Sequence, residues 1–103
     1  GTARTTITLT AVGVPATPGT PGVNPGSKEV TVQWAAPASA APITLYRVSY
    51  RVNGGMLQTQ TAAATSLKIT GLAEGNVVTA QVEAFNLAGW SGISGTGTGI
   101  AGP

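Results

Sequence analysis

The chain has 103 residues, which suits one domain large enough to bury its own core and leaves no room for a second. It has no cysteine, so we expect neither a disulfide nor a thiolate-bound metal. Five basic and three acidic residues give a net charge of +2, and the cations form no run or stripe, which argues against a nucleic-acid partner. No stretch predicts a membrane span.

The first 14 residues are predicted to be a strand or linker ahead of the main domain, which we place at residues 15–103. Apolar and polar residues alternate over residues 5–14, as they do in a half-buried strand. One reading is an extra edge strand that pairs with a neighbouring subunit through apolar side chains such as Ile7 and Leu9.

An internal repeat supports a second reading of the same segment. The pattern T-x-T-x-V-x-x-P at residues 8–15 returns as T-x-T-x-I-x-x-P at residues 96–103, an offset of 88 residues. An offset close to the length of one domain favours a tandem array, in which residues 1–14 end a preceding module. A chance match in a Thr-rich chain is the third reading, and all three stay open here.

The rest of the chain predicts short strands, because apolar and polar residues alternate in segments bounded by Gly, Pro, Asn or Ser. The clearest segments are residues 29–34, 46–51, 66–70 and 78–85, and none has helical periodicity. Their inward positions, with the corner residue that follows the third segment, predict a core of Val30, Val32, Trp34, Tyr46, Val48, Tyr50, Leu67, Ile69, Leu72, Val78 and Val82.

The turns between these strands have residues that suit tight bends. Asn53-Gly54-Gly55 tolerates positive φ and predicts a hairpin with a return strand over residues 56–61. The corner at residues 71–76 is also rich in turn formers. The glycines at 95, 97 and 99 are not followed by a helix that could hold a phosphate, so they predict a flexible or closely packed last strand.

Four motifs occur together in the order typical of one sandwich family. They are Val30-x-Val32-x-Trp34 followed by Pro37, Ile43-x-x-Tyr46-x-Val48-x-Tyr50, Leu67-x-Ile69-x-Gly71-Leu72, and Val82-x-Ala84-x-Asn86-x-Ala88-Gly89-x-Ser91.

Over about residues 18–100 these motifs resemble the fibronectin type III family. The resemblance implies an all-β, immunoglobulin-like sandwich of seven antiparallel strands, with Trp34 and Tyr46 in its core. The family's corner tyrosine is replaced by Val78, so we expect the corner to be held by packing against Leu72 and by backbone hydrogen bonds alone. The family's Arg-Gly-Asp adhesion loop is missing, because the chain has no aspartate.

The chemistry of the side chains predicts no enzyme, no metal site and no cofactor. The chain lacks histidine, cysteine and aspartate, so it offers no ordinary general base or nucleophile. Its three carboxylates, Glu29, Glu74 and Glu83, fall at a strand start, a turn and an outward strand face. We interpret them as solvated charges, with Glu83 across from Arg47 or Arg51.

The segment from residue 86 to residue 93 is the best candidate for a contact surface, with Leu87, Trp90 and Ile93 as its apolar side chains. Such a Trp anchors protein partners or stacks on sugar rings. The alternative is that Trp90 folds back over the edge of the sandwich.

We therefore expect a spacer or contact module of an extracellular assembly, bound to neighbouring protein modules or subunits. The wealth of Ala, Gly and Thr and the lack of Cys and of Asn-x-Ser/Thr sites favour a bacterial surface or secreted protein, or a bacteriophage tail or capsid component. A carbohydrate-binding accessory module that uses Trp90 on a surface glycan is the alternative. We expect no nucleic acid and no membrane insertion.

Overall fold

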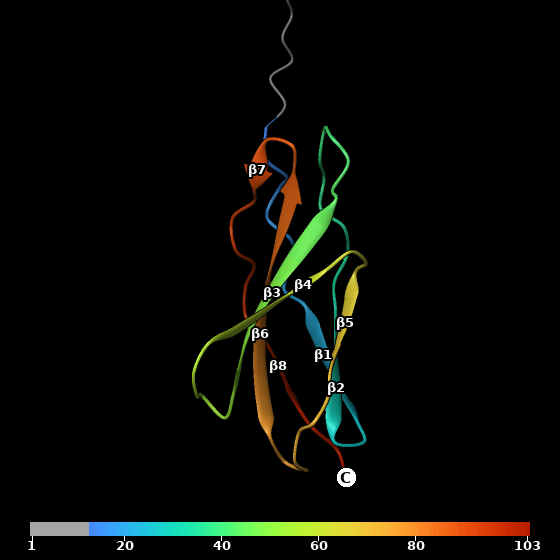
Figure 1. Ribbon diagram of the computed structural model, residues 1–103, viewed down its shortest axis with the longest axis vertical. Helices are drawn as coiled ribbons and strands as arrows, with labels where there is room; N and C mark the ends of the chain where they lie inside the picture. The colour runs from blue at the N-terminus through green and yellow to red at the C-terminus, as the bar shows by residue number, and fades with distance from the viewer. Residues whose placement is uncertain (1–12) are drawn as a thin grey trace, which may run out of the picture.

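The computed structural model describes residues 13–103 as two packed β-sheets (Figure 1). This confirms the all-β sandwich. Ile7 and Leu9 lie outside the described residues. Within residues 13–103, no helix is long and apolar enough to cross a membrane.

The strands divide into one small sheet and one large sheet, and paired strands are antiparallel. The small sheet has the order β1-β2-β5, with bounds Gly22–Gly26, Glu29–Gln33 and Ser66–Ile69. The large sheet has the order β4-β3-β6-β7, with bounds Gln58–Ala62, Leu45–Val52, Val77–Asn86 and Gly89–Trp90, and β8 (Gly97–Ile100) also pairs with β6.

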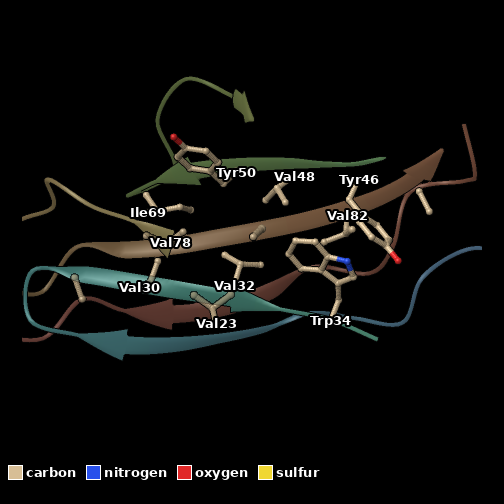
Figure 2. Close-up of a cluster of buried hydrophobic side chains, with 13 residues drawn as sticks. Val23, Val30, Val32, Trp34, Tyr46, Val48, Tyr50, Ile69, Val78 and Val82 are labelled. Carbon is tan, nitrogen blue, oxygen red and sulfur yellow. The ribbon is translucent and has the colours of Figure 1, made fainter. Parts of the chain in front are cut away.

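The core lies between the sheets, where the valines of β2 face those of β3 and β6 (Figure 2). Trp34 and Tyr46 pack edge to face at one end of it, with ring centroids 5.3 Å apart. Burial raises the pKa of the Tyr46 hydroxyl above its ordinary value. Nine expected core residues belong to the buried cluster, whereas Leu67 and Leu72 are only partly buried against it; the nine are Val30, Val32, Trp34, Tyr46, Val48, Tyr50, Ile69, Val78 and Val82.

The described residues form eight strands rather than the seven expected, because the last strand is split into β7 and β8. Two serines bridge the interval. The Ser91 N–H donates to the Ala84 carbonyl at 2.7 Å and its hydroxyl accepts from the Ala84 N–H at 2.9 Å. Ser94 pairs with Val82 in the same way, at 3.0 and 2.8 Å. Serine side chains thus replace main-chain carbonyls, and pairing with β6 continues without a regular ladder.

The glycines near the C-terminus close the sandwich along the side where β8 passes β1. A Cβ on Gly97 would meet the Pro21 carbonyl oxygen, and one on Gly99 would meet the Val23 carbonyl oxygen. Only glycine permits this approach of two backbones. Of the two readings of the Gly-rich tail, the structure shows the closely packed strand.

Two turns differ from the expectations. The return strand of the hairpin, β4, begins at Gln58 rather than Met56, because pairing with β3 ends at the Tyr50–Gln58 pair and leaves residues 56 and 57 in the turn. The corner was expected to be held by packing of Val78 against Leu72 and by backbone bonds alone, and the absence of a side-chain bond from that expectation was wrong. The Asn76 side-chain oxygen accepts the Ala73 N–H at 2.8 Å and so takes over part of the missing tyrosine's task.

Candidate functional site

The expected contact residues lie along the β6–β7 turn and the segment that follows it. Leu87 at the turn is 77% exposed and Ile93 is 47% exposed, whereas Trp90 in β7 is only partly exposed. The large apolar surface at this end of the sandwich is therefore Leu87 rather than Trp90.

Trp90 packs against the outer face of the large sheet. It stands opposite Phe85 in the β6–β7 pair, with ring centroids 4.8 Å apart and planes at 48°. The Arg47 guanidinium carbon lies 4.3 Å from the centre of the indole, a cation–π contact. One face of the ring is thus covered by a cation, and the indole lies back over the sheet.

Arg47 is itself held in place by Glu83, its cross-strand neighbour. Arg47 Nε and Nη2 donate to Glu83 Oε1 and Oε2 at 2.9 and 3.1 Å. The hydrogen bond to Glu83 raises the pKa of the Arg47 guanidinium, burial lowers it, and the negative charge of Glu83 raises it. Because 36% of the Arg47 side chain is exposed, we assign this ion pair about 1 kcal/mol of stability at most.

The other two carboxylates have different surroundings. Glu29 lies 3.4 Å from Lys68 Nζ across β2 and β5, in a second ion pair, whereas Glu74 is an exposed turn residue. Among residues 13–103, no three His, Cys, Asp or Glu side chains gather as metal ligands. The same residues enclose no pocket.

Asn86 organises the end of the sandwich at which the described chain begins. Its side chain is fully buried, and Nδ2 donates to the Gly13 carbonyl and to the Ser39 hydroxyl, both at 3.0 Å. Its Oδ1 accepts the Ala88 N–H at 2.8 Å. The Ala16 N–H adds a bond to the Ala38 carbonyl. We name residues 13–16, 38–41 and 86–89 the N-terminal pole.

The opposite end of the sandwich, the C-terminal pole, consists of residues 26–28, 71–76 and 101–103. Ala101 exchanges two hydrogen bonds with the β5–β6 corner, to the Asn76 carbonyl and from the Gly75 N–H, both at 2.9 Å. Gly102 donates to the Gly26 carbonyl at 2.8 Å and accepts from the Lys28 N–H at 2.9 Å. Figure 1 shows the blue start of the described chain and the C-terminus at opposite ends of the long axis.

Sequence reasoning missed the structural task of Asn86 and five of the exposed apolar side chains of the described residues, which are Val14, Met56, Leu57, Val77 and Ile100. Val77 and Ile100 are register partners on β6 and β8, and their exposure depends on which face of the sheet is covered, which local alternation does not reveal. Met56 and Leu57 lie in the β3–β4 turn. Asn86 is part of the last of the four family motifs, and this was the one sequence signal that could have indicated its buried position.

The family model described as the fibronectin type III domain matches residues 16–99. No curated protein matches the chain in sequence.

Solved structures share the fold. A crystal structure of a run of titin domains has a TM-score of 0.76 and 25% identity, covering 87% of this chain and 33% of that one. A human domain, the sixth of fibronectin type III domain containing protein 3, has a TM-score of 0.74 and 23% identity over 86% of this chain and 87% of that one. The FN1–FN3 domains of chicken CNTN1 have a TM-score of 0.73 and 22% identity, over 88% of this chain and 33% of that one. The chain therefore spans about a third of the titin and CNTN1 structures.

Proposed function

The chain belongs to the fibronectin type III family, and we propose that it is a non-catalytic spacer module of an extracellular assembly, with neighbouring protein modules as its partners. The observation that carries this proposal is the path of the chain, which runs in at the N-terminal pole and out at the C-terminal pole (Figure 1). A module of this kind lengthens a protein by the distance between its poles. The repeated pattern at residues 8–15 and 96–103 supports a series of such modules.

Both ends of the described chain, residues 13 and 101–102, are bonded to the body of the module. The Asn86 side chain binds Gly13, and backbone hydrogen bonds fix Ala101 and Gly102 at the other pole. A fixed position at each pole is what a spacer between two neighbours would need.

For the origin of the assembly we propose a bacterial surface or secreted protein, or a bacteriophage tail or capsid component. The support is compositional: 15 glycines, no cysteine and no Asn-x-Ser/Thr site in 103 residues. The human and chicken domains at 23% and 22% identity share the fold and do not bear on the origin.

The test of the spacer role is the solution mass of the full chain beside a version that lacks residues 1–12, with circular dichroism to verify that both are folded. We expect both to be monomers. If the full chain associates and the shortened chain does not, residues 1–12 are an assembly strand for a neighbouring subunit, and the spacer proposal is overturned.

Glycan binding through Trp90 stays the alternative prediction. The Arg47 guanidinium over the indole argues against an open stacking platform, since a sugar would have to displace a cation held by two bonds to Glu83. A glycan array scored for the full chain and for Trp90→Ala decides this: binding lost in the variant would establish the alternative.

A further inference from the structure

We propose that this module joins its predecessor through a rigid, linker-free junction, in which residues 13–15 belong to both modules at once and the N-terminal pole seats directly on the preceding C-terminal pole. This inference rests on the proposed tandem spacer. Its occupant is a preceding module of the same fold, the one whose last strand would be residues 8–12.

The first step is the alignment of the two ends of the chain. The 88-residue offset places Gly13 at the position of Ala101, and Pro15 at that of Pro103. Position 101 is an anchor: its N–H donates to the Asn76 carbonyl, and its carbonyl accepts the Gly75 N–H. In an array, Gly13 would end the preceding module in the same way.

The second step is that Gly13 is already part of this module. Its carbonyl accepts from Asn86 Nδ2 at 3.0 Å, and Pro15 two residues later is buried. A carbonyl oxygen has two lone pairs, so it accepts one bond from Asn86 and a second from a preceding module's corner. The Gly13 carbonyl is therefore not saturated by this module, and in such a junction no residue would be left over as a flexible linker.

The third step compares the backbone hydrogen bonds of Val14 with those of Gly102, the residue that the 88-residue offset aligns with it. Within residues 13–103 the Val14 N–H and carbonyl make no backbone hydrogen bond, whereas those of Gly102 are both used. A Cβ at position 102 would lie 2.9 Å from the Gly26 carbonyl oxygen, so a preceding module that receives Val14 needs a slightly wider turn there. We therefore infer a homologous predecessor rather than an identical one.

The fourth step is the surface that such a junction would cover. The N-terminal pole, residues 13–16, 38–41 and 86–89, has no charged side chain. Leu87 is 77% exposed and Val14 is 49% exposed. Val14 Cγ1 lies 3.5 Å from the position that a Cβ on Gly89 would take, so Val14 lies beside the turn that contains Leu87. An apolar, uncharged pole beside the incoming chain suits burial against the preceding module better than contact with water.

The experiment uses residues 1–103 continued by a second copy of residues 16–103, which keeps the 88-residue period. At its junction, alanine and glycine take the places of Gly13 and Val14 in the second module. A Cβ at Gly13 meets no atom within 4 Å, so the second module accommodates this change. Amide ¹⁵N relaxation then reports whether the two modules tumble together.

We expect both modules to share a rotational correlation time at least about twofold longer than that of the single chain. Leu87→Ser in the second module should loosen this coupling, while Met56→Ser, at a side chain 84% exposed and outside both poles, should leave it unchanged. In the single chain both substitutions should leave the midpoint of urea unfolding unchanged.

Two other outcomes separate the possible failures. If both modules fold and each tumbles as fast as the single chain, the rigid junction is overturned while the spacer proposal stands. If only one native module forms in the fused chain, the 88-residue period is not a module period, and both the junction and the tandem array fall.

Discussion

Replacing Gly99 by alanine tests the closure of the sandwich between β1 and β8. The new Cβ would overlap the Val23 carbonyl oxygen and lie 2.6 Å from Val23 Cγ1. Carbon atoms rest about 3.5–4.0 Å apart, so β8 would have to retreat by roughly 1 Å. Gly99 is the register partner of Val78 in β6, so the retreat would also disturb the β6–β8 pair.

The expected loss of unfolding free energy in Gly99→Ala follows from this geometry. Overpacking a tight site costs about 1–3 kcal/mol, and the upper part of this range applies because a backbone carbonyl cannot rotate away as a side chain does. For a domain of about 100 residues, each kcal/mol lowers the midpoint of thermal unfolding by about 4–8 °C. We therefore expect Gly99→Ala to unfold roughly 10–20 °C below the parent chain.

Urea and thermal unfolding followed by circular dichroism measure this effect, and Gly19→Ala is the matched control. Gly19 has no atom within 4 Å of its Cβ position, so alanine there should leave stability unchanged or raise it by up to about 1 kcal/mol. If Gly99→Ala unfolds within about 0.5 kcal/mol of the control, β1 and β8 do not pack as closely as the structure shows, and the reasoning fails.

Three further substitutions probe the other features. Ser94→Ala leaves the buried Val82 N–H without its hydroxyl partner and should destabilise the fold by about 1–3 kcal/mol in urea unfolding. Arg47→Met removes the cation that lies over the Trp90 indole and should therefore change the intensity or the wavelength maximum of tryptophan emission. The free energy of unfolding should fall by about 1 kcal/mol or less. Asn76→Ala removes a turn bond at the corner and should cost about 0.5–1.5 kcal/mol.

Each of these three has a control. Ser66→Ala removes an exposed hydroxyl, and Lys68→Met breaks the other ion pair, so both repeat the chemical change at another place. Glu74→Ala keeps the place, because it truncates an exposed residue of the same corner that makes no turn bond with Ala73. An equal loss for Ser66→Ala and Ser94→Ala would contradict the pairing of Ser94 with β6. Equal fluorescence changes for Lys68→Met and Arg47→Met would contradict the contact with Trp90.

The strands at the centre of each sheet were predictable because each has one buried face. In β2, β3 and β6 the inward positions are mostly Val, Tyr or Ala and the outward ones are mostly polar, which is the period-2 signal that defines a strand. In β1 the sequence GVNPG reads as a turn. It is a strand only because β2 supplies its partners and because an edge position tolerates Pro25.

The candidate site was less predictable, since its geometry depends on cross-strand register. The sequence places Trp90 near one end of the sandwich, but the cation over its ring follows from pairing Arg47 with Glu83 and Phe85 with Trp90 on adjacent strands. That register becomes visible only when the sheet is assembled. For the same reason, the partner of Glu83 was left open between two arginines.

The side of the sandwich and its poles have separate tasks, and this separation makes the proposed array testable. Stability depends on the side, where Gly97 and Gly99 let β8 approach β1 and the serines keep β6 paired. Contact with a neighbour would depend on the poles, where 77% of Leu87 is exposed. Substitutions at Gly99 should therefore lower the stability of single and fused chains alike, while those at Leu87 should change only how two modules move together. A variant that changed both properties equally would show that junction and core are not independent, and that the module is not a self-contained spacer.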